Sequence, residues 1–185
     1  MRVIAGKAKG HTLKCPKISR IRPTADRVRE AVFSALASLG VEWSPTLDLY
    51  AGTGAMGIEA LSRGAEEADF VERNATCCAI IKENLKATGF AEKGRVYRME
   101  ARKALCTLDR QYGLIFLDPP YAEDIESSVL PLLVASPLVG NETTIVVEHR
   151  NTTAPSETYG NFRMAKRLRH GDTCVSIFQS GGGAN

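Results

Sequence analysis

The feature that most constrains this 185-residue chain is a short apolar stretch that runs directly into a glycine-rich loop. Residues 46–50 form the pattern of a buried strand, and the loop that follows reads Gly52-x-Gly54-x-x-Gly57. Glycines permit positive φ angles and close approach of the backbone to a ligand. An amphipathic helix predicted at residues 55–63 presents unpaired N–H groups at its start. A strand, a glycine loop and a helix in this order predict a nucleotide-binding site.

The remaining apolar patterns alternate between strand and helix and end in an antiparallel hairpin. This alternation predicts an α/β fold, a Rossmann-like doubly wound, mostly parallel seven-stranded sheet with a C-terminal antiparallel hairpin and a basic N-terminal extension. Ligands of such sheets bind at the carboxyl ends of the strands. The further strands are predicted at residues 67–72, 95–99, 113–118, 143–149, 162–170 and 173–179, and the further helices at 24–39, 75–88, 101–109 and 124–135.

A second motif, Asp118-Pro119-Pro120-Tyr121, follows the apolar residues 114–117. Two consecutive prolines remove two N–H donors and fix φ, so the carbonyl groups of Asp118 and Pro119 remain as acceptors outside the sheet. Acceptors and an aromatic ring suit a flat base with an exocyclic amine. Taken alone, the four residues would be an ordinary turn that ends a strand.

Acidic residues stand at the ends of several predicted strands, among them Asp48 and Glu72. Glu72 lies about 20 residues beyond the glycine loop, where a carboxylate accepts ribose hydroxyl groups. The same spacing fits a nicotinamide dinucleotide, so Glu72 indicates a ribose and not a particular cofactor. Asp48 would repel a pyrophosphate at the loop, but it would attract the ammonium group of S-adenosylmethionine.

Four motifs follow one another in a fixed order, and with them the sequence resembles the class I S-adenosylmethionine-dependent methyltransferases, more narrowly the bacterial 16S ribosomal RNA guanine-N2 methyltransferases of the RsmD type. The resemblance covers nearly the whole chain. The motifs are Arg2-Val3-Ile4-Ala5-Gly6 with Lys9-Gly10, Arg22-Pro23-Thr24 followed by Asp26-Arg27-Val28-Arg29-Glu30, the stretch from Asp48 to Gly57 with Glu59-Ala60-Leu61-Ser62-Arg63, and Asp118 to Tyr121.

The resemblance implies S-adenosyl-L-methionine as the cofactor and N2-methylation of guanine 966 of 16S ribosomal RNA as the reaction. It implies the small ribosomal subunit, or an assembly intermediate of it, as the partner. One departure concerns Glu100-Ala101, because the family usually has Asn or Asp before this Ala to bind the adenine amine. The cofactor-binding residues that we expect are Asp48, Tyr50, Ala51, Gly52, Thr53, Gly54, Gly57, Glu72, Arg73, Glu100, Ala101 and Asp118.

The chemistry of a guanine amine suggests how the second motif acts. The N2 lone pair is delocalised into the ring, so the amine is a poor nucleophile until acceptors draw its N–H groups out of conjugation. We expect Asp118 and the Pro119 carbonyl to accept these N–H groups and Tyr121 to stack on the base. No metal is required. The chain contains His11, His149 and His170, and we interpret His149, at a strand end, as a structural histidine rather than a general base.

The positive charge is concentrated at the N-terminus. The first 29 residues contain nine Lys or Arg and one acidic residue, which gives +8, whereas the whole chain carries +3. Such a segment binds phosphates in a salt-sensitive, sequence-independent way, although a charged face exposed to water is the alternative. We expect an RNA-docking arm or hairpin at residues 1–23, a methyltransferase domain at 24–180 and a disordered tail at 181–185. The expected RNA-binding residues are Arg2, Lys7, Lys9, Arg22, Thr24 and Arg27.

Composition excludes other classes of protein. No apolar run approaches the roughly 20 residues of a membrane span, and the N-terminus lacks a signal-peptide core, so we expect a cytoplasmic monomer without a membrane or an obligate protein partner. The five cysteines have no spacing typical of a metal site or a disulfide framework.

The alternatives left open are methylation of adenine N6 or another nucleic-acid amine, methylation of a protein glutamine, a non-catalytic RNA-binding assembly factor and an NAD-binding oxidoreductase.

Overall fold

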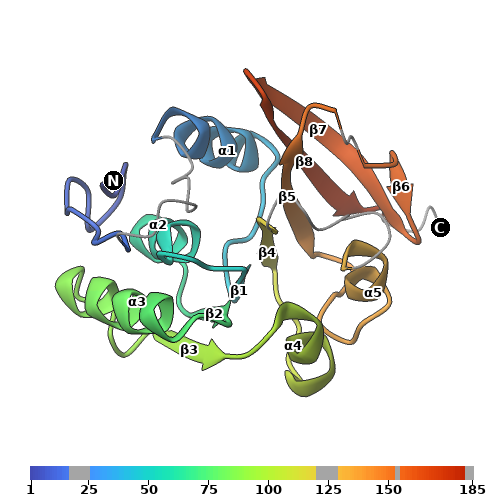
Figure 1. Ribbon diagram of the computed structural model, residues 1–185. Helices are drawn as coiled ribbons and strands as arrows, with labels where there is room; N and C mark the ends of the chain where they lie inside the picture. Colours follow the sequence, from blue (N-terminus) through green and yellow to red (C-terminus); the bar gives the residue numbers. More distant parts are fainter. Residues whose placement is uncertain (17–25, 120–128, 153–154, 182–185) are drawn as a thin grey trace.

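One sheet runs through the computed structural model, which describes residues 1–16, 26–119, 129–152 and 155–181 (Figure 1). The strand order is β3-β2-β1-β4-β5-β8-β7-β6; β1 to β5 are parallel, and the pairs β5–β8, β8–β7 and β7–β6 are antiparallel. The strands are β1 (Thr46–Leu49), β2 (Ala68–Glu72), β3 (Gly94–Arg98), β4 (Leu114–Leu117), β5 (Thr144–Arg150), β6 (Thr158–Tyr159), β7 (Phe162–His170) and β8 (Thr173–Ser180).

Helices cover both faces of the sheet, because the central strands are buried on both sides. Phe116 of β4 packs in one hydrophobic cluster with the first three helices, and its neighbour Leu117 packs in a second cluster with the other two. This is the arrangement of a doubly wound sheet, and Figure 1 shows the two groups of helices on opposite sides. The helices are α1 (Asp26–Ser38), α2 (Ala55–Arg63), α3 (Ala75–Ala87), α4 (Ala101–Thr107) and α5 (Leu130–Val134).

The alternation of strands and helices predicted from the sequence is confirmed, with one correction. The described residues contain eight strands and not seven, because the two-residue strand β6 pairs with the start of β7. A strand of two residues is too short to give a periodic pattern. Of the predicted helices at 24–39 and 124–135, residues 24–25 and 124–128 lie outside the described residues, as do residues 182–185 of the predicted tail.

The first fourteen residues fold back on themselves and form what we call the N-terminal hairpin. Arg2 and Thr12 form an isolated antiparallel bridge, and the Val3 amide donates to the His11 carbonyl at 3.0 Å. Val3 and Leu13 are buried in the cluster that contains α1 and α2. The hairpin is therefore attached to the domain by apolar contacts, while its charged side chains remain exposed.

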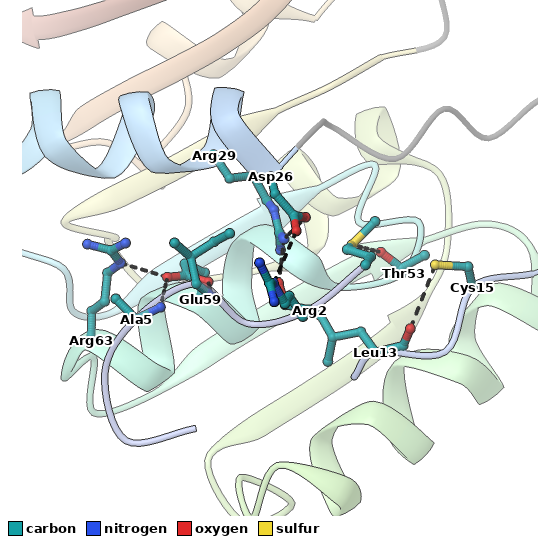
Figure 2. A network of polar contacts seen from close by, with 11 residues as sticks. Arg2, Ala5, Leu13, Cys15, Asp26, Arg29, Thr53, Glu59 and Arg63 are labelled. Carbon is teal, nitrogen blue, oxygen red and sulfur yellow. Dashed lines mark hydrogen bonds and ion pairs between the residues drawn. The ribbon is translucent and has the colours of Figure 1, made fainter. Parts of the chain in front are cut away.

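Polar contacts also hold the hairpin on α2 and α1, as Figure 2 shows. The carboxylate of Glu59, which is 0% exposed, accepts hydrogen bonds from the amides of Ile4 (2.8 Å) and Ala5 (3.0 Å) and from Arg63 Nε (2.8 Å). On the α1 side, buried Arg29 donates from Nη2 to the Arg2 carbonyl at 2.5 Å. Charge-assisted bonds to buried groups are the stronger kind, so the hairpin has a defined position.

Gly6 lets the hairpin approach α2 closely. Its φ is +80°, and a Cβ atom at this position would lie 1.9 Å from the carbonyl oxygen of Ser62. The neighbouring Lys7 amide donates to the same carbonyl at 2.8 Å. A side chain at position 6 would therefore push the hairpin away from the helix.

The described residues contain free cysteine thiols, two of them exposed, at Cys15 and Cys106. Across the four described ranges, no helix has the length and apolar character needed to cross a membrane.

Candidate active site

The loop between β1 and α2 turns through left-handed backbone positions. Gly52 (φ 55°) and Gly54 (φ 76°) adopt them without strain, but Tyr50 also has a φ of 62°. A left-handed conformation costs a non-glycine residue about 1–2 kcal/mol. Strain of this kind is concentrated at ligand sites. The Gly54 amide donates to the Ala51 carbonyl at 2.7 Å, which closes the turn and starts α2 at the carboxyl edge of the sheet.

The third glycine of the loop motif has a different role. The Gly57 Cβ position lies 2.4 Å from Cε1 of Phe70 in β2, so any side chain here would displace the ring. Gly57 therefore permits close packing of α2 against the sheet, and its amide faces the end of β1.

Asp48 occupies that end of β1. It is 3% exposed, and its Oδ2 accepts a hydrogen bond from the Gly57 amide at 2.9 Å. Burial raises the pKa of this carboxyl to about 7; the Gly57 hydrogen bond partly opposes the shift, and the negative charge of Glu72 adds to it. Asp48 thus binds one of the free N–H groups at the start of α2 and lies next to the loop as an acidic group that titrates near neutrality.

Glu72, at the end of β2, holds the other side of the loop. Its Oε2 accepts from the Gly52 amide at 3.0 Å, and its Oε1 accepts from the Asn74 amide at 2.7 Å. A carboxylate oxygen has capacity for more than one hydrogen bond. The half-buried Glu72 can therefore bind ribose hydroxyls while it keeps the loop in place.

Asn84 of α3 belongs to the same site, although no sequence motif indicates it. Its side chain, 1% exposed, accepts from the Lys14 amide at 2.8 Å and donates to the Lys14 carbonyl at 3.1 Å and the Thr53 carbonyl at 3.0 Å. One side chain thus joins the N-terminal hairpin to the glycine loop. Its partners are 70 and 31 residues away, so no local pattern marks this residue.

Asp118 lies just after β4, next to β1. It is half-buried, and the adjacent Pro119 is buried. Its pKa is raised well above the usual range of a carboxyl, chiefly by burial and then by the negative charges of Glu148 and Asp48. Asp118 also lines a small pocket of about 20 Å³ together with Glu148. The end of β4 therefore places the carboxyl group of Asp118 and the backbone of Pro119 next to the end of β1, where the glycine loop begins.

The other residues proposed for cofactor binding lie around this edge. Ala51 and Thr53 are buried in the loop. Arg73, after β2, and Glu100, before α4, are exposed, and the buried Ala101 is the first residue of α4. Glu100 is the N-cap of α4 but makes no capping hydrogen bond through its side chain, so its carboxylate is not committed to the helix.

The candidate RNA-binding residues in the described part of the chain are exposed: Arg2, Lys7 and Lys9 on the hairpin and Arg27 on α1. Arg2 also lies 3.7 Å from Asp26 in an ion pair. Arg22, Thr24 and Tyr121 lie outside the described residues.

His149 has the environment of a structural histidine. It is 2% exposed; its Nε2 lies 2.9 Å from Ser176 Oγ and its Nδ1 lies 2.8 Å from the Arg150 carbonyl. Burial lowers the pKa of the imidazole. Within the described ranges, no group of three His, Cys, Asp or Glu side chains is placed to hold a metal ion.

Comparisons with known proteins give one consistent result. A protein family described as "Conserved hypothetical protein 95" matches residues 1–179. A curated relative named "Putative rRNA methyltransferase YlbH", from Bacillus subtilis, is 37% identical over 98% of this chain and 100% of its own length. "Ribosomal RNA small subunit methyltransferase D" from Escherichia coli is 31% identical over 97% of this chain and 89% of its own length.

A solved structure agrees with these matches. The structure titled "Putative methyltransferase yhhF from Escherichia coli" superimposes with a TM-score of 0.83 at 30% identity and covers 97% of both chains.

Proposed function

The chain belongs to the family described as "Conserved hypothetical protein 95", and from this premise we propose that it is an S-adenosylmethionine-dependent methyltransferase that acts on the N2 amine of a guanine in 16S ribosomal RNA. The observation that carries the proposal is the position of Asp118 and Pro119 beside the glycine loop and Asp48. The substrate would be the RNA in the small ribosomal subunit or in an assembly intermediate, methylated in the cytoplasm by a monomer.

The glycine loop fits S-adenosylmethionine better than a dinucleotide. Backbone groups of Gly52 and Gly54 allow close approach, and Glu72 retains acceptor capacity for ribose hydroxyls. Asp48 is a buried acid where a dinucleotide would place its pyrophosphate, so it favours a ligand with a positive group. When bound, S-adenosylmethionine supplies a methyl group on a positively charged sulfur. Glu100 and Ala101 would lie at the adenine end.

Asp118 and Pro119 are suited to activating an amine. The carboxylate of Asp118 and the Pro119 carbonyl accept the two N–H groups, so the nitrogen lone pair leaves conjugation and points at the methyl donor. The same acceptors stabilise the positive charge that develops on nitrogen. The methylated amine is acidic enough to give its surplus proton to water, so Asp118 positions and polarises the amine. Tyr121 would stack on the base, which must leave its helical stack to reach the site.

The N-terminal hairpin provides a surface for RNA phosphates. Arg2, Lys7 and Lys9 are exposed on a hairpin that Glu59 fixes to α2. Arg27 of α1 is also exposed. Fixed cations bind a structured RNA with a smaller entropy cost than flexible ones, and such binding weakens as salt rises.

The test is to incubate the protein with S-adenosylmethionine and small ribosomal subunits that lack the modification, and then to identify methylated nucleosides by mass spectrometry. We expect N2-methylguanosine with the unmodified sequence, and a loss of at least about 100-fold in rate with Asp118→Ala. Asp109→Ala, at an exposed position after α4, is the matched control and should keep full activity. Methylated adenine, methylated protein or no product with intact cofactor binding would overturn the proposal.

A further inference from the structure

Glu148 lies beside Asp118 on the neighbouring strand. β4 and β5 are parallel, and their register pairs Leu117 with Val147. The residues that follow these two, Asp118 and Glu148, therefore lie side by side. Side chains alternate between the faces of a sheet. Two residues earlier, Phe116 and Val146 both pack in the cluster that contains α1. The two carboxyl groups therefore extend from the same face of the sheet, at its carboxyl edge.

Asp118 and Glu148 both line one small pocket. Its apolar wall comes from Val32 of α1, Met56 of α2 and Val175 of β8, and Val175 is the antiparallel partner of Glu148. Its volume is about 20 Å³. The pocket has room for about one water molecule, and the surface that it offers is apolar. The two carboxyl groups are brought together by the register of β4 and β5 and not by this pocket.

The edge of a base that matches two neighbouring carboxylates must carry neighbouring donors. Guanine presents N1–H next to the N2 amine, so it offers a continuous row of donors. Adenine places an acceptor nitrogen, N1, next to its amine, and cytosine does the same with N3. A carboxylate opposite such a lone pair is left without a donor, and an unpaired polar group in a partly buried site is costly. Two carboxylates side by side, as Asp118 and Glu148 are, therefore match the donor row of guanine and not the donor-acceptor edge of adenine or cytosine.

We propose that Glu148 is a specificity-determining residue, whose carboxylate accepts the N1–H of the target guanine while Asp118 holds the N2 amine. The inference rests on the proposed function and extends it, because it assigns the choice of base to a residue outside the Asp118-Pro119-Pro120-Tyr121 motif. The proposed role also explains why two acidic residues, Asp118 and Glu148, lie side by side. Glu148 is among the charges that raise the pKa of Asp118, and a base with donors toward both groups relieves that repulsion.

The test compares two bases at the target nucleotide of the small subunit: guanine and 2-aminopurine. Both carry the 2-amino group, but 2-aminopurine has an acceptor nitrogen in place of N1–H. We expect the unmodified protein to prefer guanine by about 100-fold or more in kcat/KM. In Glu148→Gln the side-chain amide can donate to the acceptor nitrogen of 2-aminopurine, so we expect this preference to fall at least about 10-fold. Glu142→Gln, an exposed glutamate just before β5, should leave it unchanged.

The outcomes distinguish the role of Glu148 from the methyltransferase assignment on which it rests. A change of the guanine-to-2-aminopurine ratio in Glu148→Gln, with both substrates methylated at N2, supports the role of Glu148; a general loss of stability would lower both rates together and leave the ratio unchanged. An unchanged ratio, or no preference in the unmodified protein, overturns the role of Glu148 and leaves the methyltransferase assignment intact. No methylation of guanine by the unmodified protein overturns both.

Discussion

The side-chain amide of Asn84 bonds to the backbone of Lys14 through both of its polar atoms, as a neighbouring strand would, and bonds at the same time to the Thr53 carbonyl. Asn84 is therefore the point at which the N-terminal hairpin and the glycine loop are joined. A segment proposed to bind RNA and a loop proposed to bind the cofactor share one buried side chain. Substitutions of Asn84 should therefore affect both the N-terminal hairpin and the glycine loop.

We expect Asn84→Ala to lower the free energy of unfolding by about 2–4 kcal/mol, because three hydrogen bonds are lost and the buried Thr53 carbonyl is left without its donor. We also expect weaker binding of S-adenosylmethionine, by about 10-fold, because the Thr53 carbonyl is no longer held. Urea denaturation and isothermal titration calorimetry measure the two effects. Asn141→Ala, at an exposed turn position, is the control. Unchanged cofactor affinity in a destabilised Asn84→Ala protein would contradict the link to the loop.

Asp48 should make the protein less stable as pH rises. Its pKa is about 7 in the folded protein, against an ordinary value of 3.8, so the folded state binds a proton that the unfolded state releases. The stabilisation from this proton is complete below about pH 4 and is lost as pH rises to 7. Between pH 5 and 8 the loss amounts to about 2–3 kcal/mol, at 1.36 kcal/mol per unit.

Asp48→Asn tests this pH dependence, because asparagine keeps an oxygen for the Gly57 amide but does not ionise. Relative to the unmodified protein, we expect the variant to gain more stability at pH 8 than at pH 5, by about 2–3 kcal/mol, measured by urea denaturation. Cofactor binding should weaken if the carboxylate attracts a positive group. The exposed Asp109→Asn is the control. Parallel stability curves for Asp48→Asn and the unmodified protein would contradict the prediction.

Gly6 and Gly10 form a matched pair for testing the attachment of the hairpin. Both have positive φ angles, +80° and +86°, but a Cβ at Gly6 would meet the Ser62 carbonyl and a Cβ at Gly10 meets nothing within 4 Å. Gly10→Ala should cost about 1 kcal/mol from backbone strain alone. Gly6→Ala should cost more and should increase hydrogen exchange of the Ile4 and Ala5 amides. It should also reduce RNA affinity. Equal effects of the two changes would show that contact with α2 is unimportant.

His149 should contribute to stability and not to the reaction. Both of its ring nitrogens have partners, at Ser176 and Arg150, so we expect His149→Ala to lose about 1–3 kcal/mol of stability and to keep its methylation rate within a few-fold. His170→Ala, on the exposed end of β7, should change neither quantity. A loss of rate of 100-fold or more in folded His149→Ala would instead assign it a role as a base.

The sequence by itself determined the order of strands and helices, the glycine loop and the family. The resemblance to the RsmD-type methyltransferases is confirmed by the match over residues 1–179. These features are local: apolar residues repeat with the period of a strand or a helix, and glycines stand where the backbone must turn. The positions of Asp48, Glu72 and Asp118 at one edge of the sheet followed from the rule that parallel strands end together.

The tertiary structure decided what depends on distant partners. The left-handed backbone conformation of Tyr50 cannot be predicted from its residue type, because tyrosine rarely adopts a positive φ. Asn84 acts on residues 31 and 70 positions away, and Glu59 acts on amides 54 and 55 positions away. Glu148 comes to lie beside Asp118 only because β4 and β5 pair in one particular register. Such contacts are set by the pairing of strands and the packing of helices, which bring together side chains that no local sequence pattern connects.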